Sequence, residues 1–162
     1  MVVIGVDSSG HVKNPPIYLI AVRRSKRKGQ MTRSVYISRE KHEEYVNYSL
    51  RMKIEHWFEK ISAILIFKAI IGIYYPGDSI NIDTDFQGRS RRYVKEYLGR
   101  LFLEKYWGDS KRNNPSITFT SVRHDEIVKE ADIKSKKLRR GYIRIDIEDP
   151  NIKKELLILK KY

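Results

Sequence analysis

The order of its apolar segments restricts the possible folds of this 162-residue chain more strongly than its composition does. Apolar runs at residues 2–7 and 17–23, and a third that begins at 35–38, have the length of strands and are separated by turn residues. From Ile54 to about Ile71 the apolar residues instead recur three and four positions apart, which predicts a helix. Three early strands followed by alternating helices and strands predict an α/β protein with a mixed sheet and helices on its faces.

The rest of the chain continues the alternation. The pattern predicts strands at residues 80–85 and 117–122, helices at 90–107 and 125–139, and a short strand at 142–147. Asp149-Pro150 is a good N-cap and N1 pair for a last short helix, although residues 156–159 could also be extended. Residues 24–33 are predicted to form a basic loop, and residues 39–52 fit either an inserted helix or an extended strand.

Length and charge indicate a single basic domain, residues 1–162. The chain has 33 Lys and Arg residues against 20 Asp and Glu, which gives a net charge of +13 and favours a polyanionic partner. A membrane is a weaker partner than nucleic acid, because Lys68 and Gly72 interrupt the longest apolar stretch. The chain has no cysteine and starts directly with a strand, so we expect a cytoplasmic protein without disulfides. Abundant Lys, Arg, Glu and Ile are typical of thermophile proteins.

Carboxylates at strand ends are the candidate catalytic groups. Asp7 ends the first strand, and Asp83 and Asp85 end the strand 80–85. Because side chains alternate along a strand, Asp83 and Asp85 share one face, and Asp7 shares a face with Val3 and Gly5. If the two strands are neighbours, these carboxylates lie close together and repel one another unless a proton or a cation intervenes. Mg²⁺ or Mn²⁺ suits such oxygen ligands, and two ions can cleave a phosphodiester.

At this point the chain resembles the ribonuclease-H-like superfamily. Glu59, which precedes an apolar helical stretch, is similar to the glutamate of that family's first helix, and Thr84-Asp85-Phe86-Gln87 is similar to its Thr-Asp-x-Gln motif. Asp132 in a late helix, with His124 upstream, is similar to the family's last aspartate and its flexible histidine. The resemblance covers about residues 1–140, with residues 39–52 as an insertion and residues 142–162 as a C-terminal extension.

The resemblance implies a five-stranded mixed sheet, with three antiparallel strands and then parallel βα units, and helices on both faces. It also implies a small, archaeal or thermophilic, metal-dependent nuclease that binds two Mg²⁺ or Mn²⁺ ions and no small-molecule cofactor. The metal ligands would be Asp7, Glu59, Asp83, Asp85 and Asp132, with His124 as a further catalytic group. The substrate would be single-stranded DNA or an RNA·DNA hybrid.

Three basic clusters are candidate contacts to the nucleic acid backbone. They are Arg24, Lys26, Arg27 and Lys28; Arg89, Arg91, Arg92 and Lys95; and Lys136 and Arg139. The second cluster opens a helix, where the helix dipole disfavours cations, so phosphate contact explains it better than an ordinary surface does. The cluster with Lys136 ends a helix, where cations are favourable, so a helix salt bridge to Asp132 also explains it.

Two other functions fit the same residues. The chain could be a non-catalytic nucleic-acid-binding protein on the same fold, with structural carboxylates, or a junction-resolving or strand-transfer enzyme. The sequence does not fix the sugar preference, the cleavage polarity or the oligomeric state. Metal dependence separates the first alternative from a nuclease, because chelation stops cleavage and leaves binding.

Overall fold

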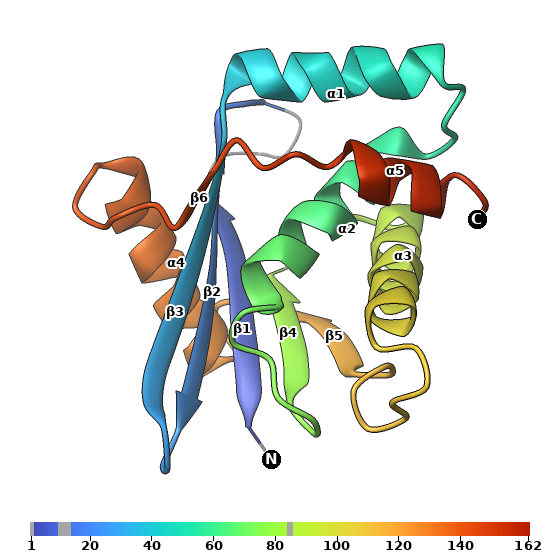
Figure 1. Ribbon diagram of the computed structural model, residues 1–162. Helices are drawn as coiled ribbons and strands as arrows, with labels where there is room; N and C mark the ends of the chain where they lie inside the picture. Colours follow the sequence, from blue (N-terminus) through green and yellow to red (C-terminus); the bar gives the residue numbers. More distant parts are fainter. Residues whose placement is uncertain (1, 10–13, 84–85) are drawn as a thin grey trace.

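The strand that starts the chain lies inside the sheet, with neighbours on both sides. In the computed structural model, which describes residues 2–9, 14–83 and 86–162, β1 (Val3–Ser9) pairs antiparallel with β2 (Ile17–Ser25). β2 pairs antiparallel with β3 (Gly29–Ile37). On its other side β1 pairs parallel with β4 (Ser79–Asp83), which pairs parallel with β5 (Ser116–Thr120). The α/β class and the mixed sheet are therefore confirmed (Figure 1).

The sheet has one strand more than expected. Within the described residues it contains six strands in the order β5-β4-β1-β2-β3-β6, where five were predicted. The sixth, β6 (Ile147–Glu148), is only two residues long and pairs parallel with the outer edge of β3. The predicted strand at 142–147 was therefore placed too early, because the pairing starts only at its last residue.

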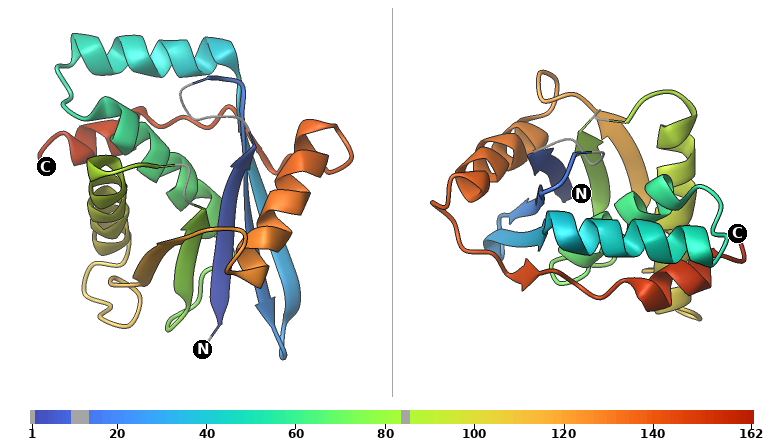
Figure 2. Two further views of the ribbon diagram at one scale, coloured as in Figure 1. Left: turned by 180° about the vertical axis from the view of Figure 1, so that it is seen from behind. Right: turned by 90° about the horizontal axis from the view of Figure 1, so that it is seen from above.

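Helices cover both faces of the sheet, as predicted. α4 (Glu126–Arg139) packs against β1 and β2 on one face. The other face carries α2 (Trp57–Ile70), which contacts β2 and β3, and around it α1 (Arg39–Arg51), α3 (Arg89–Lys105) and α5 (Lys153–Leu159). Figure 2 shows this division from above, with α4 alone on its side. No helix in the described part of the chain has both the length and the apolar character of a membrane span.

The main core lies between α2 and the sheet. Most residues of α2 are buried, including Ile61, Ile64 and Leu65, which explains why its sequence is apolar on nearly every side. From the strands, Ile4 and Val6 belong to the same core. The helix predicted for residues 54–71 is confirmed, with a later start at Trp57.

α4 approaches β1 unusually closely at Gly5. A Cβ atom added to Gly5 would lie 2.5 Å from the carbonyl oxygen of Ile127, which is backbone and cannot move aside. Asp125 begins the helix as its N-cap and accepts hydrogen bonds from the backbone N–H groups of Ile127 and Val128 at 3.0 and 3.1 Å. A glycine in the strand thus lets the helix backbone sit directly on the sheet.

The predicted basic loop at 24–33 is mostly strand, which corrects that expectation. β2 continues to Ser25, β3 begins at Gly29, and these two residues are paired. The turn therefore contains only residues 26–28, and Gly29 takes the left-handed conformation, with φ +64°, that three-residue hairpins require. The hairpin end contains few apolar residues because it extends beyond the core, so apolar alternation could not reveal it.

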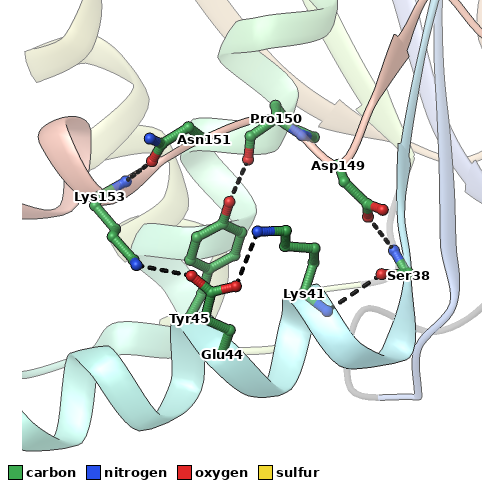
Figure 3. Close-up of polar contacts among 8 residues, drawn as sticks. All are labelled: Ser38, Lys41, Glu44, Tyr45, Asp149, Pro150, Asn151 and Lys153. Atoms are coloured by element: carbon green, nitrogen blue, oxygen red, sulfur yellow. Dashed lines mark hydrogen bonds and ion pairs between the residues drawn. The ribbon is translucent and has the colours of Figure 1, made fainter.

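The inserted segment and the C-terminal extension pack on one another. Residues 39–51 form a helix, α1, which resolves the ambiguity of the sequence, and Ser38 is its N-cap. The Ser38 backbone N–H donates to Asp149 Oδ1 at 2.7 Å, and the Tyr45 hydroxyl donates to the Pro150 carbonyl oxygen at 2.6 Å (Figure 3). Asp149-Pro150 was predicted to cap the last helix; instead Asp149 caps the start of α1, and α5 begins at Lys153.

Candidate metal and nucleic-acid site

Asp7 and Asp83 lie side by side at the same edge of the sheet. β1 and β4 are parallel neighbours whose register pairs Val6 with Ile82, so the next residue on each strand is an aspartate. Asp83 is the last residue of β4, and it influences Asp7 both through a hydrogen bond and through its charge. The pattern of strand ends in the sequence therefore predicted a real juxtaposition.

Asp7 is buried and carries a strongly shifted pKa. Its relative exposure is 3%. Burial is the main reason that its pKa is raised from 3.8 to about 7, and the neighbouring Asp83 and Asp132 raise the pKa further. A carboxylate in this position gains by binding a cation, because a cation offsets both the lost hydration and the repulsion.

Ser135 holds Asp7 in place, and the sequence analysis did not identify it. Its hydroxyl donates to Asp7 Oδ2, and the same oxygen lies 2.9 Å from the Asp132 carbonyl oxygen. This hydrogen bond lowers the pKa of Asp7 and opposes the effect of burial. Ser135 is fully buried on the face of α4 that carries Val128, Ala131 and Leu138. The sequence does contain one signal for Ser135: it is a small polar residue at a helix position where apolar residues otherwise recur.

Asp132 comes to the same site from α4. It is half-buried, and its charge acts on Asp7. The Lys136 ammonium lies 2.7 Å from Asp132 Oδ2, one helical turn away, and this hydrogen bond raises the pKa of Lys136. Lys136 thus contacts Asp132 in the way that the salt-bridge interpretation of the sequence expected.

Glu59 has a different partner from the three aspartates. It lies in the first turn of α2 and accepts a hydrogen bond from the Ser90 hydroxyl of α3 at 2.8 Å. A small cavity between α2 and the sheet touches Asp7 and Asp83, and the α2 residues that line it are Ser62, Leu65 and Ile66. Within the described residues, the carboxylates that act on Asp7 are Asp83 and Asp132.

Asp85 and His124 add little to this geometry. Asp85 and Thr84 lie outside the described residues, so the Thr-Asp-x-Gln segment is seen only from Phe86 onward. His124 is exposed and immediately precedes Asp125, the N-cap of α4. Asp125 also accepts a hydrogen bond from the Asn81 side-chain amide, which ties the start of α4 to the middle of β4.

Two basic clusters lie at the same end of the molecule as the aspartates. Arg89, Arg91, Arg92 and Lys95 lie on the first two turns of α3, which begins next to Phe86, and Phe86 lines the cavity beside Asp83. Arg91 Nε donates to the Phe86 carbonyl oxygen, while Arg89, Arg92 and Lys95 are exposed. Lys136 and Arg139 end α4 beyond Ser135. These clusters flank the carboxylates from both faces of the sheet.

The remaining cluster, that of the β2–β3 hairpin, lies at the opposite end of the sheet. Asp7 pairs with Ile20 on β2, and Lys26 follows six residues later, beyond the end of that strand. At a rise of about 3.3 Å per residue this corresponds to roughly 20 Å. Figure 1 shows the β2–β3 hairpin at the bottom, whereas the C-terminal ends of β1 and β4 point upward. Arg24, Lys26, Arg27 and Lys28 therefore lie far from the aspartates.

The described residues contain no group of three or more His, Asp or Glu side chains arranged to hold a metal ion. Asp7 and Asp83 are the pair that comes closest to such a site, with Asp132 acting from α4. A comparison of the chain with protein-family models and with curated proteins finds no match.

Proposed function

We propose that this protein is a divalent-metal-dependent nuclease of the ribonuclease-H-like superfamily, which hydrolyses phosphodiester bonds of nucleic acid. The main support is the juxtaposition of Asp7 and Asp83 on neighbouring parallel strands, next to Asp132, in a chain with a net charge of +13. A basic protein that keeps a few carboxylates together at one edge of a sheet is suited to holding a cation against a polyanion.

The residues at this edge fit Mg²⁺ or Mn²⁺. Carboxylates are the preferred ligands of these ions, and burial together with two neighbouring aspartates raises the pKa of Asp7 to about 7. Asp7 and Asp83 would hold the metal, and Asp132, Glu59 and Asp85 are the further candidate ligands. Two ions would lower the pKa of an attacking water and stabilise the leaving oxygen.

The chain itself orients its ligands and holds the substrate. The Ser135 hydroxyl fixes one oxygen of Asp7. The Lys136 ammonium holds one carboxylate oxygen of Asp132 through an ion pair. Arg89 and Arg92, which are exposed at the start of α3, would contact phosphates near the carboxylates. The substrate would be single-stranded DNA or an RNA·DNA hybrid.

The topology agrees with this assignment. Three antiparallel strands followed by two parallel ones, with helices on both faces, is the arrangement that the resemblance implies. The parts that the resemblance does not require, α1 and the tail after residue 142, contact each other.

The decisive experiment measures cleavage of end-labelled single-stranded DNA, duplex DNA, RNA and RNA·DNA hybrid with Mg²⁺, Mn²⁺ or EDTA. We expect cleavage that depends on metal and that Asp7→Asn abolishes. Asp109→Asn is the matched control, because Asp109 lies in the loop after α3, where it pairs with Arg112 and accepts a hydrogen bond from the Lys111 backbone N–H. Asp7→Asn should keep a folded structure, since an amide oxygen can still accept from Ser135.

A second readout is independent of turnover. Mn²⁺ should raise the melting temperature of the wild-type protein and of Asp109→Asn, and should leave that of Asp7→Asn unchanged. A protein that cleaves none of the four substrates, and that Mn²⁺ does not stabilise, would contradict the nuclease.

One observation favours a non-catalytic nucleic-acid-binding protein as the second candidate. Glu59 is engaged by Ser90, and the described carboxylates near Asp7 are only two. Retained salt-sensitive binding without metal-dependent cleavage would support this candidate. A junction-resolving or strand-transfer enzyme would use the same metal site and would require a branched substrate or a dimer.

A further inference from the structure

The β2–β3 hairpin forms one side of an open groove. This groove lies at the opposite end of the sheet from Asp7 and Asp83. The groove has a volume of about 560 Å³ and is lined by Val2, Arg23, Arg24, Ser25, Lys26, Arg27, Lys28 and Tyr75. Arg24, Lys26, Arg27 and Lys28 are all exposed, so four positive charges surround a concave surface, and Arg24 also pairs with Glu130 of α4. Such a surface attracts phosphate groups.

Arg23, one of the residues that line this groove, is fixed by a buried ion pair. Arg23 Nε and Nη2 donate to the two carboxylate oxygens of Asp78 at 2.7 and 3.0 Å, and both side chains are buried. Asp78 also accepts a hydrogen bond from the Tyr75 backbone N–H at 2.9 Å. The pair therefore fastens the loop that carries Tyr75 to the end of β2.

One nitrogen of the Arg23 guanidinium has no hydrogen-bond partner among the described residues. Arg23 is 5% exposed, and among the described residues its Nη1 has no hydrogen-bond partner. A buried donor without a partner is costly, and a water or a ligand oxygen that enters the groove would satisfy it. Arg23 is thus held in place by a buried ion pair, and a ligand that enters the groove can reach its unpaired donor.

Tyr75 adds an aromatic surface between the cations. The Arg23 guanidinium lies 4.6 Å from the centre of its ring, and the Lys28 ammonium lies 3.6 Å from it. The nearby Lys28 lowers the pKa of the Tyr75 hydroxyl. Because the Lys28 side chain is exposed, a base can replace it over the ring while its ammonium moves to the adjoining phosphate.

A cationic groove with an aromatic platform is the arrangement that binds single-stranded nucleic acid. We propose that this hairpin groove binds a single-stranded segment of nucleic acid, with phosphates on Arg24, Lys26, Arg27 and Lys28 and a base stacked on Tyr75. The site lies roughly 20 Å from Asp7, so it binds a part of the strand that is remote from the carboxylates. The inference extends the proposed function by naming the form of substrate and a second contact.

The test is binding of labelled oligothymidylates of 4, 8 and 16 nucleotides, and of a 16-base-pair duplex, in EDTA. Tyr75→Leu should weaken binding of the 16-nucleotide strand at least fivefold and leave duplex binding nearly unchanged, because paired bases cannot stack on the ring. Tyr162→Leu is the matched control, since Tyr162 is 42% exposed after α5 and also has a guanidinium over its ring, that of Arg100 at 4.5 Å.

Charge reversal supplies a second variant that does not depend on Tyr75. Arg27→Glu with Lys28→Glu should weaken binding of the 16-nucleotide strand at least tenfold, whereas Lys160→Glu with Lys161→Glu, which changes the net charge equally, should have a much smaller effect. Equal losses from the two pairs, or equal losses of duplex and single strand in Tyr75→Leu, would overturn the proposal.

The binding experiments test the hairpin groove separately from the nuclease activity. If Asp7→Asn and the wild type both fail to cleave while the hairpin variants still lose single-strand binding, the groove stands and the nuclease does not. If cleavage of long strands survives unchanged in the hairpin variants, together with unchanged binding, the nuclease stands and the groove does not.

Discussion

At the scale of single residues, the chemistry of this protein centres on Asp7. The side chain is almost fully buried, has two aspartates as neighbours and accepts a hydrogen bond from the Ser135 hydroxyl. The sequence predicted that Asp7 and Asp83 lie close together on the condition that their strands are neighbours, and the pairing of β1 with β4 meets that condition. It could not find Ser135, because its role depends on how α4 is rotated against β1.

Asp7 should make the metal-free protein less stable as the pH rises. A carboxyl group whose pKa is higher in the folded chain prefers to be protonated there, so the cost of ionising it is absent below about 3.8 and complete above about 7. Relative to wild type, Asp7→Asn should therefore gain stability between pH 4 and pH 8 in EDTA, by about 1.4 kcal/mol per unit of effective shift.

The measurement is urea unfolding of both proteins at pH 4, 5, 6, 7 and 8. Asp109→Asn should follow the wild type throughout. A difference between Asp7→Asn and wild type that stays constant over this range would mean that Asp7 titrates normally.

At the scale of elements, ion pairs tie distant segments together, and their burial decides what each contributes. The Arg23–Asp78 pair joins the end of β2 to the loop before β4 with both side chains buried. The Lys41–Glu44 pair, by contrast, lies on the surface of α1, where water screens it. The sequence contains the charged residues of both pairs, but only the fold shows that one pair is buried and the other exposed.

Asp78→Ala should therefore destabilise the protein by about 3–5 kcal/mol, because it leaves the Arg23 charge buried and unpaired. Glu44→Ala should cause a much smaller loss. Denaturant unfolding at pH 7 compares the two variants directly, and similar losses in both would show that Arg23 finds another partner or water.

At the scale of the whole molecule, the sequence predicted the order of elements better than their ends. Apolar periodicity identified the central strands and the helices, because those segments are buried on one or more faces. It missed the hairpin end at residues 24–33, where the two strands pair with each other beyond the core. It also assigned Asp149 to the wrong helix, since that cap depends on a contact between segments 111 positions apart.

The distribution of charge over the molecule predicts strong salt dependence of nucleic acid binding. If the hairpin groove contacts four phosphates of a single strand, the affinity should fall roughly fiftyfold between 50 and 200 mM NaCl, from a slope of about 0.7 per phosphate. Fluorescence anisotropy in EDTA measures this slope. Binding that is insensitive to salt would show that the net charge of +13 does not act on the phosphates.

The contact between α1 and the tail has a consequence for how the chain is made. The amide that opens α1 is satisfied by a carboxylate near the C-terminus, and β6 pairs with β3 across a similar separation. During synthesis the start of α1 and the outer edge of β3 must therefore wait for residues 147–149 before these contacts can form. Long-range closure of this kind slows folding and leaves the nascent chain open to misassembly until residues 147–149 have been made.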